Sequence, residues 1–298
     1  MSVEKILEGA YDLHVHSAPD IIKRKLDDVE MVQRLRESKM KGYAIKSHVS
    51  STTGRAKLLN KLYPDIDVIG TISLNNAVGG LNPFAVEVAA RDGAKLVWLP
   101  TIDSVNEQEH IDKIANTNPE KLPFFAKFRM ELKEKGKLQD PINILDGDSL
   151  KKVMYDIIET AIEYDLSIAT GHISTKEVFV FAKEAKKAGL KKLIITHPEF
   201  PSTSMTKEEQ KELAEMGAYL EHCFTTPYTN KITWEEVYEQ IRYVGPEHCI
   251  LSTDLGQPAY VYPDEGMKIF AENLLNNGFS ESEIKTMMCV NTKYLISK

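Results

Sequence analysis

Short apolar runs alternate with longer amphipathic segments along the whole chain of 298 residues, and this alternation is the strongest constraint on the fold. Several runs, such as Leu193, Ile194 and Ile195, are almost continuously apolar, which is typical of parallel strands that helices cover. The sequence predicts eight strands, at residues 11–16, 43–48, 68–74, 95–101, 166–171, 192–197, 218–223 and 249–254.

The segments between the predicted strands carry the signals of helix ends. A Ser or Thr followed three residues later by Glu, the pattern of a capping box, occurs at residues 174–177, 206–209, 233–236 and 280–283. Pro83 follows Asn82 at a predicted helix start, and Gly189 follows a predicted helix end. Eight such βα units predict an α/β protein with a (β/α)8 TIM barrel, and an open doubly wound sheet is the alternative.

The length and composition agree with one domain. The chain is 42% hydrophobic and 27% charged, as in ordinary globular proteins, and an α/β barrel takes about 250 residues as a single domain. We therefore expect a single domain over residues 1–298.

Residues 102–148 interrupt the alternation after the fourth predicted strand. Residues 106–115 have helical character, and residues 128–145 alternate enough to predict a small hairpin that turns at Lys135, Gly136 and Lys137. An insertion after a barrel strand lies on the catalytic face, so this one is either a lid over the site or a packing or oligomer contact.

Charge and cysteine content exclude some classes of function. The net charge is −7 and there is no basic run, so the chain is a poor candidate for binding nucleic acid. Cys223, Cys249 and Cys289 are scattered, which indicates a reducing compartment. Neither a membrane span nor a secretory signal is apparent. We expect a soluble, cytoplasmic protein that acts on a small molecule, with homo-oligomer formation left open.

The first predicted strand contains Asp12, His14 and His16 in a D-x-H-x-H pattern. Alternate side chains of an extended strand share one face, so we expect all three to point the same way. Two imidazoles on one face can bind one metal ion, and a nearby carboxylate can hold an imidazole in the required tautomer.

Single histidines and an aspartate recur where later strands are predicted to end. His172 follows the fifth strand, His197 the sixth and Asp254 the eighth. In a parallel barrel these strand ends lie on one face, so they are expected to meet His14 and His16 there. Imidazole and carboxylate ligands suit Zn²⁺ and several other divalent ions, and the ligand types alone do not select among them.

On these motifs the chain resembles the amidohydrolase superfamily of metal-dependent hydrolases, over all eight predicted strands. The resemblance implies one or two divalent ions, with Zn²⁺ the first choice. It implies that His14, His16 and Asp254 bind the more buried ion and that His172 and His197 bind a second. In one-metal members the first of that pair is a ligand and the second aids catalysis. Asp254 would also take a proton from the attacking water, as a carboxylate beside a metal-activated water can.

One departure from the superfamily concerns the bridge between two metals. Two-metal members often use a carboxylated lysine or a glutamate from strand four, but the fourth predicted strand here ends in neither. Lys46, at the second strand, and Glu221, at the seventh, are the candidate replacements, or the site holds one metal. Lys46 is also a candidate for binding an anionic substrate, and His48 is a candidate for binding either the metal or the substrate.

Further polar and charged residues are candidates for lining the substrate pocket. Lys127 and Arg129 in the insertion are candidates for binding an anionic substrate. The polar residues that follow the third and fourth strands are expected to line the pocket: Asn75, Asn76, Thr101 and Asp103.

The leading hypothesis is a hydrolase in which a metal-activated water attacks an amide, cyclic amide, ester, lactone or phosphoester. A mononuclear decarboxylase, deaminase or isomerase of the same superfamily is the second reading. The third is a metal-binding barrel without turnover. A catalytic metal keeps an open coordination position, whereas a structural one is closed by protein ligands, so the geometry of the site separates the last reading from the first two.

Overall fold

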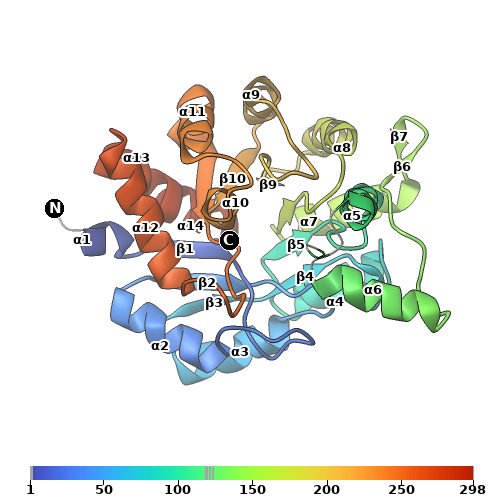
Figure 1. The fold of residues 1–298 in the computed structure, drawn as a ribbon, viewed down its shortest axis with the longest axis horizontal. Helices are drawn as coiled ribbons and strands as arrows, with labels where there is room; N and C mark the ends of the chain where they lie inside the picture. The colour runs from blue at the N-terminus through green and yellow to red at the C-terminus, as the bar shows by residue number, and fades with distance from the viewer. Residues whose placement is uncertain (1–2, 118–119, 121, 123, 298) are drawn as a thin grey trace.

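The computed structural model describes residues 3–117, 120, 122 and 124–297, and the other positions, which include part of the expected 102–148 insertion, lie outside it. Helices surround a central set of strands (Figure 1). None of the helices in the described ranges is both long enough and apolar enough to span a lipid bilayer.

All eight predicted strands are present, and the third is divided into two short strands. The strands are β1 (Tyr11–Val15), β2 (Gly42–Ile45), β3 (Asp67–Ile69), β4 (Thr71–Ser73), β5 (Leu96–Trp98), β8 (Ser167–Ala169), β9 (Leu193–Thr196), β10 (Tyr219–Cys223) and β11 (Cys249–Ser252). Gly70 separates β3 from β4, and a Cβ there would lie 2.7 Å from the Cα of Thr53, so the close approach of the preceding helix, which begins at Thr53, requires glycine.

The strands form parallel sheets in the orders β1-β2-β3 and β11-β10-β9-β8-β5-β4. Backbone hydrogen bonds also join β1 to the segment after β11. The Asp254 amide donates to the His14 carbonyl and the His16 amide donates to the Leu255 carbonyl, both at 2.8 Å. The carboxyl ends of β1 and β11, which carry predicted site residues, are therefore neighbours.

Local chemistry sets the helix boundaries. The longer helices around the strands are α2 (Asp28–Ser38), α3 (Thr53–Leu62), α4 (Pro83–Arg91), α7 (Lys152–Glu163), α8 (Thr175–Ala188), α9 (Lys207–Glu215), α11 (Trp234–Val244) and α12 (Pro263–Asn276). The four predicted capping boxes are confirmed, at the starts of α8, α9, α11 and α13 (Glu281–Lys285).

Shorter helical segments lie at the termini and between the larger elements. They are α1 (Val3–Leu7), η1 (Asn76–Val78), α10 (Thr225–Tyr228), η3 (Pro246–His248), η4 (Thr286–Val290) and α14 (Asn291–Ile296). Fully buried side chains such as Leu13, Trp98 and Ile194 pack together beneath the site.

The described part of the insertion contains two helices, α5 (Val105–Thr117) and α6 (Phe124–Glu134). The predicted helical part is confirmed, but the hairpin at Lys135 to Lys137 is wrong. Phe128, Met130 and Leu132 alternate as in a strand, yet Met130 is 53% exposed, whereas Phe128 and Leu132, four residues apart, line one cavity. A two-stranded hairpin does occur later, between β6 (Leu145–Asp146) and β7 (Ser149–Leu150).

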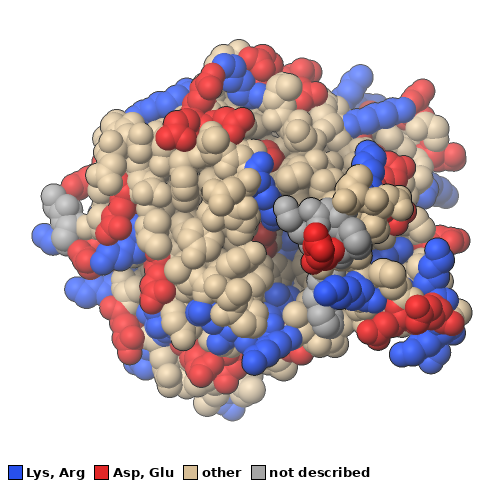
Figure 2. All heavy atoms as spheres, in the orientation of Figure 1, with Lys and Arg blue, Asp and Glu red and all other residues tan. Residues whose placement is uncertain are grey.

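The surface charges are mixed. On the face that Figure 2 shows, acidic and basic side chains are interspersed around an uncharged central area. This pattern differs from the stripe of basic residues that a polyanion-binding face presents.

Candidate metal centre

Three of the predicted ligands converge at the carboxyl ends of β1 and β11. Oδ1 of Asp254 lies 3.2 Å from Nε2 of His14 and 3.1 Å from Nε2 of His16. Their ligand atoms all lie within 4.8 Å of one another, and both imidazoles are buried. Two imidazoles and a carboxylate at this spacing form a group that can hold a divalent ion.

Asp12 departs from the expected alternation. The pairing of β1 is irregular between Asp12 and Val15, so strict two-residue periodicity does not hold there. The Asp12 carboxylate accepts hydrogen bonds from the amide and hydroxyl of Thr253 and from the His14 amide, and among the described residues no hydrogen bond joins it to an imidazole ring. Burial raises the pKa of Asp12 to about 7 despite these donors. Asp12 therefore ties β1 to the end of β11.

The other ring nitrogens of the two β1 histidines have acceptors. Nδ1 of His14 lies 3.2 Å from Oε2 of Glu221, and Nδ1 of His16 lies 3.0 Å from the carbonyl oxygen of Lys46. A proton on each Nδ1 leaves the Nε2 lone pair free to bind a metal ion. Burial, followed by the charge of Arg24, lowers the pKa of His16 to about 3, so that ring is neutral.

His172 and His197 form a second pair beside the first. Their Nε2 atoms are 3.2 Å apart, and Nδ1 of His172 lies 3.1 Å from Oε2 of Glu107. The ring centroids of His14 and His197 are 6.0 Å apart, so the two pairs adjoin. Nδ1 of His172 and Nδ1 of His197 are both buried and, within the described ranges, neither makes a hydrogen bond. The four histidines predicted as ligands are thus brought together.

Left-handed backbone turns direct these side chains. His197 and Asp254 have φ values of 27° and 53°, which are uncommon for residues other than glycine. Gly171, just before His172, has φ of 63°, and a Cβ there would lie 2.5 Å from the Leu99 carbonyl oxygen. Such strained conformations are held only where the surroundings enforce them, and they cluster at functional sites.

Lys46 and His48 also reach the cluster. Nζ of Lys46 lies 2.8 Å from Nε2 of His14 and 5.1 Å from the centroid of the Trp98 ring. Burial lowers the pKa of Lys46. The His48 ring stacks on that of His16 with centroids 4.9 Å apart, and its Nδ1 lies 2.9 Å from Oγ1 of Thr101. Burial holds the pKa of His48 well below its usual value.

A cavity of about 350 Å³ adjoins the cluster. The predicted site residues that line it are His16, Lys46, His48, His172, His197 and Asp254. His14 and Glu221, which are fully buried, are absent from the described lining residues. Glu221 approaches the His14 nitrogen that faces away from Asp254.

Sequence reasoning missed three charged residues of the cavity: Lys231, Glu107 and Arg24. Glu107 comes from α5 in the insertion and contacts His172. Arg24 comes from the loop after β1, where its Nη2 lies 2.7 Å from Asp20 and 3.4 Å from Nδ1 of His16. No local sequence pattern distinguishes these residues from other charged residues nearby. They reach the cavity only because the segments that carry them fold over the strand ends.

The charged insertion residues proposed from the sequence do not line this cavity. Nη1 of Arg129 binds Oδ1 of Asp103 at 2.8 Å beside a neighbouring cavity, and Lys127 is exposed. Asn75 helps to hold His48 in place, since its side-chain amide donates hydrogen bonds to the His48 carbonyl and to the Thr101 hydroxyl.

The chain belongs to a family of unknown function, DUF6282, whose model matches residues 9–221. No curated protein was found to match the sequence. The family membership therefore leaves the activity open.

Solved structures with a similar fold are hydrolases by name. An amidohydrolase from Pseudomonas aeruginosa has a TM-score of 0.66 and 12% identity over 99% of this chain and 98% of its own. A probable dipeptidase from the same organism has a TM-score of 0.64 and 8% identity, over 98% and 95%. A lactonase from Listeria monocytogenes has a TM-score of 0.59 and 12% identity, over 100% and 96%. At these identities the likeness concerns the fold.

Proposed function

We propose that this chain is a metal-dependent hydrolase of the amidohydrolase superfamily, built as a single (β/α)8 barrel domain over residues 1–298. The observation that carries the proposal is the gathering of four imidazoles and Asp254 beside one cavity, with acceptors for the outer nitrogens of His14 and His16 and the Glu107 carboxylate 3.1 Å from that of His172. Closure of the barrel is supported by the hydrogen bonds between β1 and the segment after β11.

His14, His16 and Asp254 are the proposed ligands of a first divalent ion, and His172 and His197 those of a second. The donor set suits Zn²⁺, since imidazole and carboxylate are common ligands of that ion. When bound, the metal acts as a Lewis acid and lowers the pKa of water toward about 7. The side chains are arranged to complement that chemistry.

Asp254 is the proposed proton acceptor. Burial alone would raise its pKa, but the neighbouring His14 and His16 hold the pKa well below the usual value, so the carboxylate is ionised. Its Oδ2 accepts a hydrogen bond from Oγ1 of Thr225 at 3.1 Å, which fixes the carboxylate at the cavity wall. A positioned, ionised carboxylate can take the proton of an attacking water.

Lys46 is the proposed replacement for the missing strand-four bridge. The fourth strand of the barrel, β5, presents Trp98 near this point, and the Lys46 ammonium lies between that ring and His14. Carboxylation would turn this lysine into a bridging ligand, and without carboxylation it binds an anionic group of the substrate. Glu221 orients His14 rather than bridging two ions, because it contacts the outer ring nitrogen.

The open cavity favours catalysis over a purely structural metal. A structural site is closed by four protein ligands, whereas four of the proposed ligands here, His16, His172, His197 and Asp254, line about 350 Å³ of space. The bond cleaved is proposed to be an amide, cyclic amide, ester, lactone or phosphoester, and cavity shape selects among them.

Elemental analysis of protein purified without chelator tests the proposal. We expect one or two divalent ions per chain, and loss of metal in His16→Gln but not in the control His248→Gln, which alters a histidine of η3 away from the cluster. Two equivalents support a Lys46 bridge, and one favours the mononuclear decarboxylase, deaminase or isomerase reading. No metal after reconstitution would contradict the proposal.

A further inference from the structure

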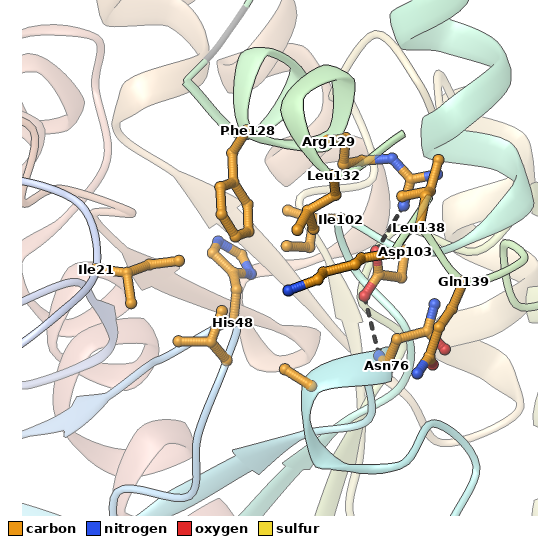
Figure 3. Close-up of a pocket in the computed structure, with 13 residues that line it drawn as sticks. Ile21, His48, Asn76, Ile102, Asp103, Phe128, Arg129, Leu132, Leu138 and Gln139 are labelled. Carbon is orange, nitrogen blue, oxygen red and sulfur yellow. Dashed lines mark hydrogen bonds and ion pairs between the residues drawn. The ribbon is translucent and has the colours of Figure 1, made fainter. Parts of the chain in front are cut away.

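A second cavity, of about 340 Å³, lies beside the metal cavity. His48 and Ile102 line both, so the two spaces are neighbours across these side chains. Figure 3 shows His48 below Phe128, with Leu132 and Ile102 alongside and the Asp103, Arg129 and Asn76 group opposite. His48 and Ile102 are thus the side chains that a molecule bound in the metal cavity would pass to reach the second space.

Most of the second cavity is apolar. Its larger apolar lining residues are Ile21, Val49, Ile102, Phe128, Leu132 and Leu138. Ile21 is 52% exposed at this wall, an unfavourable position for an isoleucine unless another apolar group covers it. The lining thus favours an apolar occupant.

The two nearly buried charged groups of this cavity, Asp103 and Arg129, pair with each other. Oδ1 of Asp103 lies 2.8 Å from Nη1 of Arg129, and Oδ2 of Asp103 accepts a hydrogen bond from the Asn76 amide at 2.9 Å. Both charged side chains are nearly buried, with exposed fractions of 12% and 11%. Lys137 and Gln139 are exposed lining residues. An anionic group among the buried lining residues would have to compete with Asp103 for Arg129, and the remaining cation, Lys137, is exposed to solvent, so an uncharged group fits the buried part better.

We propose that the second cavity binds an uncharged, apolar substituent of the substrate whose reacting group lies in the metal cavity. This inference rests on the proposed hydrolase function and narrows its substrate class to compounds with an alkyl or aryl chain. Helix α6 contributes Phe128, Arg129 and Leu132 to the subsite. The insertion then determines specificity.

Straight-chain carboxylates are suitable probes, because hydrolysis of an acyl substrate releases a carboxylate. Binding of butyrate, hexanoate and octanoate to the wild-type protein is measured by titration calorimetry, in metal-loaded and metal-free samples. We expect affinity to rise about twofold to fourfold with each methylene that enters the cavity. Equal affinities for the three acids, or no binding of octanoate, would overturn the inference.

Two substitutions fill the cavity from opposite sides. Leu132→Trp enlarges a side chain of α6 and Ala77→Trp one of η1, and both should abolish the preference for octanoate while leaving butyrate binding unchanged. The control Leu58→Trp adds the same ring at an exposed site on α3 and should bind like the wild type. If both cavity variants keep the octanoate preference, the subsite lies elsewhere.

Failure of this inference is distinguishable from failure of the hydrolase proposal. Metal content and turnover are measured separately, whereas the chain-length preference is also read in metal-free protein. A protein that holds no metal but keeps the preference would contradict only the hydrolase proposal. A metal-loaded protein without the preference would contradict only the second cavity.

Discussion

The outer nitrogens of the clustered histidines are the decisive detail at the scale of single residues. Nδ1 of His14 and Nδ1 of His16 have hydrogen-bond acceptors within 3.2 Å, which are Glu221 and the Lys46 carbonyl, and the Glu107 carboxylate lies 3.1 Å from Nδ1 of His172 without a hydrogen bond. Acceptors at these positions select the tautomer and raise the basicity of the opposite nitrogen. The acceptors should therefore matter almost as much as the ligands.

Glu221 provides a direct test of this arrangement. Glu221→Leu removes the acceptor from the buried His14 ring, and we expect metal affinity to fall about 10-fold to 100-fold. Glu221→Gln keeps a carbonyl oxygen and should lose less. Competition with a chelator of known affinity measures the change. Glu235→Gln, at an exposed site on α11, is the control, and unaltered affinity in Glu221→Leu would refute the orienting role.

Asp254 allows a second test on single residues. Asp254→Asn removes the proton acceptor while keeping the shape of the side chain, so turnover should fall on the order of 10²-fold to 10⁴-fold. The assay uses a panel of ester, amide, lactone and phosphoester substrates. Asp156→Asn, at an exposed site on α7, should retain full turnover. Unchanged turnover in Asp254→Asn would remove the residue from the mechanism.

At the scale of elements, the ends of the strands and the loops that follow them build the site. β8 ends just before Gly171, whose left-handed conformation sends the chain past Leu99 and carries His172 to its partner. Helix α5 of the insertion then brings Glu107 to the same ring. The strand end and the insertion therefore act together on one ligand.

Alanine substitutions at Gly171 and Gly189 distinguish the effect of steric crowding from that of backbone strain. Both have positive φ, but a Cβ would lie 2.5 Å from a backbone oxygen at Gly171 and meet nothing within 4 Å at Gly189. Gly189→Ala should lower the free energy of unfolding by about 1–2 kcal/mol through strain alone. Gly171→Ala should cost about 1–3 kcal/mol more, because backbone must move. Urea denaturation measures the free energy of unfolding of both variants. Equal losses would mean that the backbone around Gly171 moves at little cost.

At the scale of the whole molecule, the site joins segments that are far apart in the chain. His14 and Asp254 come from opposite ends of the chain, and His172 and His197 come from its middle. A metal ion bound among them would connect β1, β8, β9 and β11. Binding to the native state alone stabilises a protein by about 2.7 kcal/mol when the free ligand is at 100 times its Kd.

Removal of the metal should therefore lower the melting temperature. We expect a decrease on the order of 5 °C after dialysis against chelator, followed by recovery when Zn²⁺ is added back. Differential scanning calorimetry measures the change. His16→Gln, which lacks a ligand, should melt at the same temperature with and without chelator. If the melting temperature of the wild-type protein changes neither with chelator nor with added metal, the proposed metal site is contradicted.

The sequence predicted the strands and the capped helices because these depend on local patterns. The run of apolar residues at β9 and the capping box before α8 each lie within a few neighbouring positions. The hairpin failed because Phe128, Met130 and Leu132 satisfy a two-residue period over a stretch too short to separate it from a helical one. The expected direction of Asp12 failed because an irregularity in β1 breaks the alternation.

By itself the sequence determined which residue types end each strand, and hence that His14, His16, His172, His197 and Asp254 were the candidates for one site. Only the tertiary structure decided the charges around them. Glu107 and Arg24 lie in loops and an insertion whose positions depend on packing against distant strand ends. The residue types, which the sequence gives directly, decide which atoms can bind a metal. The charged groups beside those residues come from distant parts of the chain, so no local sequence pattern predicts them.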